Sequence, residues 1–261
     1  MLRTLALAFA LIGALTGCGS LKLPTTPGDP KVAYEFGYTP VDSLPVSVSP
    51  TTATRAKTLR ALPDETMRLA VGTFNAKTGL TFGVAKIGVA GNSYVVILDY
   101  TKFTTVPFGV TKSKPGGKVI VNAMNDKSSD IHVPVYVGVG LRLTASVNVM
   151  EGEVDLGNLF ALGVAAQAKK INGTLVIQSL GLSGSSVSPL IPIPGEINAT
   201  TIQNALVAIG SIKAKLYDAD DTSMTVVPRV LGVYNTIGGG EETINSFIAQ
   251  VLANPPTLEV K

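Results

Sequence analysis

The sequence contains little cysteine and histidine, and it has no tryptophan. Cys18 is the single cysteine and His132 the single histidine among 261 residues. Disulfides, thiolate zinc sites and multi-histidine metal sites all need more of these side chains than the chain provides. A Ser-His-Asp site would have to use His132. We therefore expect no metal, no cofactor and no catalytic thiol, and we expect His132 to have a structural role or to be solvated.

Charge is also sparse. Charged side chains make up 15% of the sequence, against about 25% in an average globular domain. The net charge of +3 is spread along the chain, whereas binding to nucleic acid needs a clustered basic face. The composition therefore predicts no nucleic-acid partner. It favours a β-rich body with much buried or partner-covered surface.

The N-terminal residues have the pattern of a secretory signal. Arg3 precedes an apolar stretch from Leu5 to Leu15, which is shorter than the roughly 20 residues of a membrane-spanning helix. The residues Leu15-Thr16-Gly17-Cys18 follow directly. A leucine, two small residues and a cysteine at this depth resemble the lipobox of bacterial lipoprotein precursors. An ordinary signal peptide with a chance cysteine is the alternative.

The resemblance implies a location as well as a modification. In this family residues 1–17 are removed, and the cysteine, here Cys18, carries a diacylglycerol and usually an acylated amine. Two or three acyl chains hold a protein on a membrane, whereas one chain binds only marginally. No aspartate follows Cys18, and in the family an aspartate there often marks retention at the inner membrane. The resemblance thus implies the bacterial cell envelope, at the outer membrane facing the periplasm in a host with two membranes.

Residues 18–63 are predicted to be a lipidated tether rich in Pro, Thr and Ser, because such composition favours extended chain. Tyr34-Glu35-Phe36-Gly37-Tyr38 interrupts it with three aromatic residues. We expect this stretch to dock on the body; a short partner-binding motif is the alternative. Beyond the tether we expect a β-rich region over 64–150 and a mixed α+β region over 151–261, which can form one domain together.

The β-rich region contains several strand patterns. Runs rich in β-branched and aromatic residues predict strands at Met67–Phe74, Leu80–Val89 and Tyr94–Phe103. Residues 94–98 are apolar at both parities, which predicts burial on both faces. Every second residue from Ile131 to Val149 is apolar, which predicts one buried and one wet face. A long strand bent at Gly138 and Gly140 is the favoured interpretation, and a membrane-inserting hairpin is the alternative.

The second half predicts about three helices. The first is expected from Asn158 as N-cap through Lys170, ending at Asn172-Gly173 and followed by a strand over 174–182. The second starts at Asn198 or Thr200. Residues 211–217 satisfy both strand and helix spacing; we favour a strand, with another over 224–233. The last helix is expected over 241–252. The predicted fold class is therefore α+β, β-rich, with antiparallel sheets and about three helices in the C-terminal half.

Several short motifs are weak. Lys77-Thr78-Gly79 matches a triad of penicillin-binding proteins, but the Ser-x-x-Lys that those enzymes need does not occur in the chain. Gly138-Val139-Gly140 begins like a dinucleotide loop without the third glycine, and Gly238–Gly240 precedes a helix without a P-loop lysine. We interpret these as turns, a bend and a link. The remaining candidates are an acidic turn at Asp218, Asp220 and Asp221, and a basic end of the tether at Arg55, Lys57 and Arg60.

Three functions compete. The lipobox and the poverty of catalytic groups favour a lipid-anchored, non-enzymatic envelope protein that binds or scaffolds other envelope proteins or copies of itself. An envelope-polymer hydrolase would use Glu151, Glu153 and Asp155 as acid and base, provided that one of them is buried. A β-rich ring or pore-like oligomer would assemble through residues 131–149. We expect the first, with Cys18 as the lipidation site.

Overall fold

The computed structural model of the chain describes residues 37–41, 45–75, 79–82, 87–113, 120–124, 131–218, 221–238 and 240–261. The predicted fold class is confirmed, because the protein is α+β and β-rich, its sheets are antiparallel, and its helices lie mostly in the C-terminal half. The predicted signal peptide, the lipidation site Cys18 and the tether up to residue 36 lie outside the described residues.

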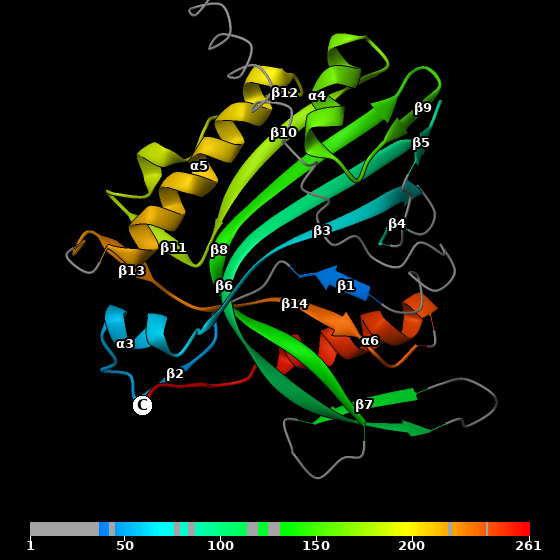
Figure 1. Cartoon of the computed structure of the whole chain (residues 1–261). Coiled ribbons are helices and arrows are strands. Elements are labelled where there is room, and N and C mark those ends of the chain that lie inside the picture. The colour runs from blue at the N-terminus through cyan, green and yellow to red at the C-terminus, as the bar shows by residue number, and fades with distance from the viewer. Residues whose placement is uncertain are drawn as a thin grey trace, which may run out of the picture.

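Two long antiparallel strands, β6 (Ser93–Ser113) and β8 (Ile131–Val149), form the centre of the main sheet. They pair along most of their length, from Ser93 opposite Asn148 to Val110 opposite Ile131. The two strands curve strongly in Figure 1. Each exchanges its outer neighbour along its length, so the sheet divides into two halves that share β6 and β8.

The two halves of the sheet have different outer strands. In the first half of the sheet, β3 (Asp64–Asn75) pairs with the N-terminal part of β6, and β10 (Ile171–Leu180) pairs with the C-terminal part of β8. In the other half, β7 (Ile120–Met124) pairs with β6, and β14 (Arg229–Asn235) pairs with β8. The sheet is extended by β4 (Gly79–Phe82) on β3, β12 (Gly195–Glu196) on β10, and β1 (Gly37–Pro40) on β14.

Three small two-stranded sheets and the helices complete the described fold. The small sheets pair β2 (Val48–Ser49) with β15 (Leu258–Glu259), β5 (Ile87–Val89) with β9 (Glu153–Asp155), and β11 (Leu182–Gly184) with β13 (Met224–Val226). The helices are α3 (Arg55–Arg60), α4 (Leu159–Gln167), α5 (Ala199–Tyr217), α6 (Gly240–Ala253) and the 3₁₀ turn η2 (Ser188–Leu190). None of the helices in the described ranges has the length and apolar composition needed to cross a bilayer.

One face of the long strands carries the main core. The odd-numbered residues of β8 from Val133 to Val149 are all buried, as are Tyr94, Val96 and Leu98 of β6. Helices α4 and α5 cover this face beside β10, while α6 lies beside β7 and β14 (Figure 1). We call it the helix face. The predicted burial of the apolar residues is therefore confirmed from Val133 to Val149, whereas Ile131 at the start of β8 is exposed.

The opposite face is not wet along its whole length, contrary to the expectation from the alternating pattern. His132 and Ser146 near the two ends of β8 are exposed, but Arg142 and both glycines in the middle are buried. Strands β14 and β1 belong to the second half of the sheet, and β1 contacts β3 of the first half (Figure 1). They supply Leu231 and Tyr38 to small cores on this face. The opposite face of the sheet is thus partly covered by β1 and β14, which belong to the same sheet.

Gly138 and Gly140, the predicted bend positions, lie where β8 exchanges its neighbour β10 for β14. A Cβ atom at Gly140 would lie 2.0 Å from the Tyr100 carbonyl oxygen, and one at Gly138 would lie 2.2 Å from the Lys102 carbonyl oxygen. Only glycine allows β6 to approach β8 this closely, since a side chain would collide with backbone atoms. The Gly138-Val139-Gly140 pattern is therefore explained by the close approach of the two backbones, and it does not form a dinucleotide loop.

The helix starts are as predicted, but two ends differ. Asn158 and Asn198 cap α4 and α5 with their side chains, and Asn198 forms a capping box with Thr201. Helix α4 ends at Gln167, and β10 already begins at Ile171, so Asn172-Gly173 lies in a strand. The favoured strand over 211–217 is wrong. Helix α5 continues to Tyr217, because Ile212 and Leu216 extend the buried face of Ile202, Ala205 and Ile209 at helical spacing.

Two further boundaries differ from the predictions. The predicted strand over 224–233 is divided into β13 and β14 at Pro228, which has no backbone N–H to donate. Residues 45–62, predicted to be tether, pack against the body instead, and Leu62 is fully buried. Since β8 pairs with both β10 and β14, the regions 64–150 and 151–261 share one sheet.

Candidate functional site

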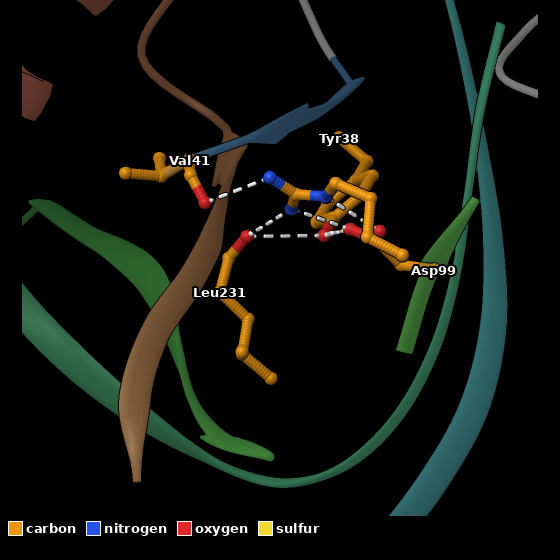
Figure 2. Close-up of polar contacts among 5 residues, drawn as sticks. Tyr38, Val41, Asp99 and Leu231 are labelled. Atoms are coloured by element: carbon orange, nitrogen blue, oxygen red, sulfur yellow. Dashed lines mark hydrogen bonds and ion pairs between the residues drawn. The ribbon is translucent and has the colours of Figure 1, made fainter. Parts of the chain in front are cut away.

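A buried group of polar side chains lies where β1 and β14 cover the opposite face. Asp99 of β6 and Arg142 of β8 are direct cross-strand neighbours, and Tyr38 reaches them from β1. Asp99 is 0% exposed. Figure 2 shows Tyr38, Val41, Asp99 and Leu231 converging on one set of hydrogen bonds. We call Tyr38, Asp99 and Arg142 the buried polar cluster.

Arg142 binds Asp99 through two parallel hydrogen bonds. Its Nε donates to Asp99 Oδ1 and its Nη2 to Oδ2, both at 2.7 Å. The guanidinium also donates to the carbonyl oxygens of Val41 and Leu231, both at 3.0 Å. Such bidentate geometry is the strongest that an arginine offers a carboxylate. Arg142 therefore joins β6, β8, β14 and the end of β1 at one point.

Tyr38 completes the coordination of Asp99. Its hydroxyl donates to Asp99 Oδ2 at 2.5 Å. Burial and the neighbouring Asp99 charge raise the pKa of Tyr38 well above its usual value, although Arg142 opposes this. Burial tends to lower the pKa of Arg142, but hydrogen bonds to Asp99 outweigh it and raise the pKa. The tyrosine therefore stays neutral and the arginine charged at any physiological pH, which suits a structural cluster.

A second arginine lies beside the buried polar cluster. Arg68 of β3 is the cross-strand neighbour of Asp99. Its guanidinium carbon lies 3.8 Å from the ring centre of Tyr136 and 4.3 Å from that of Phe103. Cation–π attraction of this kind contributes about 0.5–2 kcal/mol, more where water is excluded. Arg68 thus packs its charge against aromatic faces next to the Asp99–Arg142 pair.

A third polar group forms at the C-terminal end of α5, on the helix face. Glu65 of β3 accepts hydrogen bonds from Lys213 and Tyr217 of α5, both at 2.5 Å. Lys102 of β6 places its ammonium 5.4 Å from the Tyr217 ring centre. Burial acts to raise the pKa of Glu65, but the hydrogen bonds from Lys213 and Tyr217 outweigh it and lower the pKa. These contacts fasten the end of α5 to the sheet.

The carboxylates expected for a hydrolase do not form a buried pair. Glu151, Glu153 and Asp155 are all exposed at the β8–β9 turn and along β9. Asp155 accepts a hydrogen bond from the Gly157 backbone N–H, which closes a turn. A general acid needs a raised pKa, which burial supplies. The geometry therefore gives no support to the hydrolase alternative.

The other candidates have local roles or fall partly outside the described residues. His132 is exposed, and its carbonyl oxygen accepts a hydrogen bond from Thr236. Arg55 donates to the carbonyl oxygens of Lys215 and Asp218 and so caps the C-terminus of α5. Lys57 and Arg60 are exposed on α3. Lys77, Thr78, Asp220, Gly239 and Tyr34–Phe36 lie outside the described residues.

Asp221, the end of the predicted acidic turn, makes bonds within its own segment. Its carboxylate accepts hydrogen bonds from the backbone N–H and the hydroxyl of Ser223. Hydrogen bonds from Ser223 and Ser186 lower its pKa. The Lys215 Nζ atom lies 3.6 Å from Asp221 Oδ2. Over the described ranges, no group of three His, Cys, Asp or Glu residues is arranged to hold a metal ion. Asp221 therefore has a turn-forming role.

The sequence analysis missed the buried polar cluster. A signal existed, since Asp99 directly follows the apolar run 94–98, and Arg142 is a charged residue within the alternating segment. Opposite charges in two buried strands imply a pair. The register that makes Asp99 and Arg142 neighbours is not visible in the sequence. Tyr38 docks as predicted for its aromatic stretch.

No family model, no curated protein and no solved structure matches this chain.

Proposed function

We propose that this chain is a lipid-anchored protein of the bacterial cell envelope with a non-enzymatic binding or scaffolding role. The observation that carries the proposal is Cys18, placed after Leu15-Thr16-Gly17 at the end of a short apolar stretch. Acyl chains on this cysteine would hold the body at a membrane without a spanning helix. In a host with two membranes we place it at the outer membrane, facing the periplasm.

The body supports a binding role through the way its ionisable groups are used. Asp99 and Arg142 are saturated by each other and by Tyr38, Val41 and Leu231. A catalytic acid or base must instead reach a substrate. The buried polar cluster is thus committed to holding strands together, which favours a scaffold over an enzyme.

Among the described residues, most of the alternating segment is already paired on both edges and is not available to a ring. Strand β8 pairs with β6 on one side and with β10 and β14 on the other. Its apolar residues from Val133 to Val149 are buried in the protein's own core. A ring or pore-like oligomer would have to form through another surface, so we do not propose one through residues 131–149.

Membrane attachment is tested by a cysteine substitution in the full chain. We expect the wild-type protein to incorporate a fatty-acid probe in living bacteria and to sediment with membranes. Cys18→Ser should lose the probe and prevent lipoprotein processing, so residues 1–17 should remain. Ser20→Ala, two residues away, is the matched control and should behave as wild type. A wild-type chain without label would contradict the proposal.

A further inference from the structure

Helix α4 presents an apolar surface that the described chain leaves uncovered. Phe160 and Val164 are 66% and 67% exposed and lie one helical turn apart. Leu159, Leu162 and Ala165 on the other side of the helix are buried in the core. The helix is therefore apolar on both sides, although a surface helix normally turns polar residues outward.

This surface includes a groove between α4 and β9. The groove has a volume of about 430 Å³. Its apolar lining consists of Val154, Phe160, Ala161, Val164, Ala165 and Ala168. Apolar patches rimmed by polar residues mark interaction sites. The groove and the two exposed side chains together define what we call the α4 surface.

The α4 surface has an acidic end and a basic end. Glu153 and Asp155 line the groove just before the helix begins, and Lys170 lines it just after the helix ends. Lys169 stands beside Lys170, and all four side chains are exposed. A copy of the same surface turned end to end would place each acidic end against a basic end. The surface is thus complementary in charge to itself.

We propose that the α4 surface binds a second copy of this chain across a two-fold axis, with the two α4 helices antiparallel. In such an isologous interface the same patch serves both partners. Phe160 and Val164 would lie at the centre, away from water, while Glu153 and Lys170 pair at the rim. Antiparallel helices also bring opposite ends of their dipoles together. The proposal goes beyond the envelope function and does not depend on lipid at Cys18.

A lipid surface fits the α4 surface less well. Glu151, Glu153 and Asp155 outnumber Lys169 and Lys170 at this end of the molecule. Anionic lipid head groups would repel the acidic side chains, whereas a basic amphipathic face attracts them. Charge complementarity therefore favours a second copy.

The first test is crosslinking of the full chain in living bacteria. Val164→Cys is expressed in two forms with different tags and treated with a short bifunctional maleimide. We expect a product of twice the chain mass that carries both tags. Val207→Cys on α5 is the matched control, because Val207 is 61% exposed and lies outside the α4 surface; it should give little of this product. The unsubstituted chain measures any background from Cys18.

The second test reverses the rim charges in the Val164→Cys background. Glu153→Lys and Lys170→Glu should each reduce the doubly tagged product several-fold, because each creates two like-charge contacts across the axis. The double variant should restore it, since both contacts become attractive again. Circular dichroism of each purified variant checks folding. The proposal is overturned if Val164→Cys gives no doubly tagged product, if it crosslinks only to other proteins, or if the folded double variant fails to recover.

Discussion

At the scale of single residues, Arg142 links four segments of the sheet through its hydrogen bonds. Its bonds to Asp99 hold β6 to β8, and its bonds to Val41 and Leu231 hold the strands that cover them. A buried ion pair gives little net stability compared with apolar residues, because both charges lose their hydration. Its importance lies in what happens when one partner is missing.

Arg142→Met should lower the free energy of unfolding by about 3–5 kcal/mol, because it leaves the Asp99 carboxylate buried without a counter-charge. The double variant Asp99→Leu/Arg142→Met should recover part of that loss, since no unpaired charge remains. Urea unfolding followed by circular dichroism measures both. If the double variant were as unstable as the two single variants combined, the unpaired charge would not be the cause.

Glu65 predicts a pH dependence of stability. Hydrogen bonds from Lys213 and Tyr217 lower its pKa from the usual 4.5 in the folded protein. A lowered folded pKa contributes stability that is present above the unfolded pKa and is lost as pH falls through the folded value. The difference in unfolding free energy between wild type and Glu65→Gln should therefore shrink below about pH 4.5.

Chemical denaturation at a series of pH values from 7 to 3 measures this difference. Glu259→Gln is the control, since Glu259 is an exposed carboxylate on β15 and lies outside the α4 surface. Its difference from wild type should stay small throughout. A Glu65→Gln difference that grew as the pH fell would contradict the account.

At the scale of secondary-structure elements, the bend of the central strands depends on backbone contact. The absence of a side chain at Gly140 allows β8 to lie against the Tyr100 carbonyl. In this region the sheet exchanges β10 for β14, which pairs with Gly138. The two glycines therefore lie where β14 replaces β10 beside β8.

Gly140→Ala should destabilise the protein by about 1–3 kcal/mol or more, because the new methyl group must displace backbone. Gly210→Ala is the matched control, since a Cβ atom there has no atom within 4 Å. It lies inside α5 and should stabilise the protein by about 0.5–1 kcal/mol. Thermal unfolding of both variants compares them directly. Equal effects of the two substitutions would mean that the close approach at Gly140 is not required.

Most elements were predictable because they follow local rules. The alternation over 131–149 and the N-cap residues Asn158 and Asn198 predict β8 and the starts of α4 and α5. The end of α5 was not predictable, because residues 211–217 fit two periods and only packing against the sheet decides between them. The packing of residues 45–62 was not predictable either, because their proline-rich composition is typical of a tether. Leu62 is nevertheless buried in the core.

At the scale of the whole molecule, a shared sheet unites the two regions that composition suggested. Strand β8 belongs to the first region, and its neighbours β10 and β14 belong to the second. The first strand of the described chain, β1, carries Tyr38 into the buried polar cluster. The predicted tether therefore enters the body at the buried polar cluster. A lipid anchor ahead of the tether would hold a rigid body, and the α4 surface would remain free for a second copy.

Lipidation of Cys18 is the central claim, and the intact mass of the protein extracted from bacterial membranes tests it most directly. We expect a chain that begins at residue 18 and carries the added mass of a diacylglycerol, with or without a third acyl chain on the amine. Fragmentation should place the added mass on the first residue. A chain that retains residues 1–17, or one that begins elsewhere with an unmodified Cys18, would contradict the account.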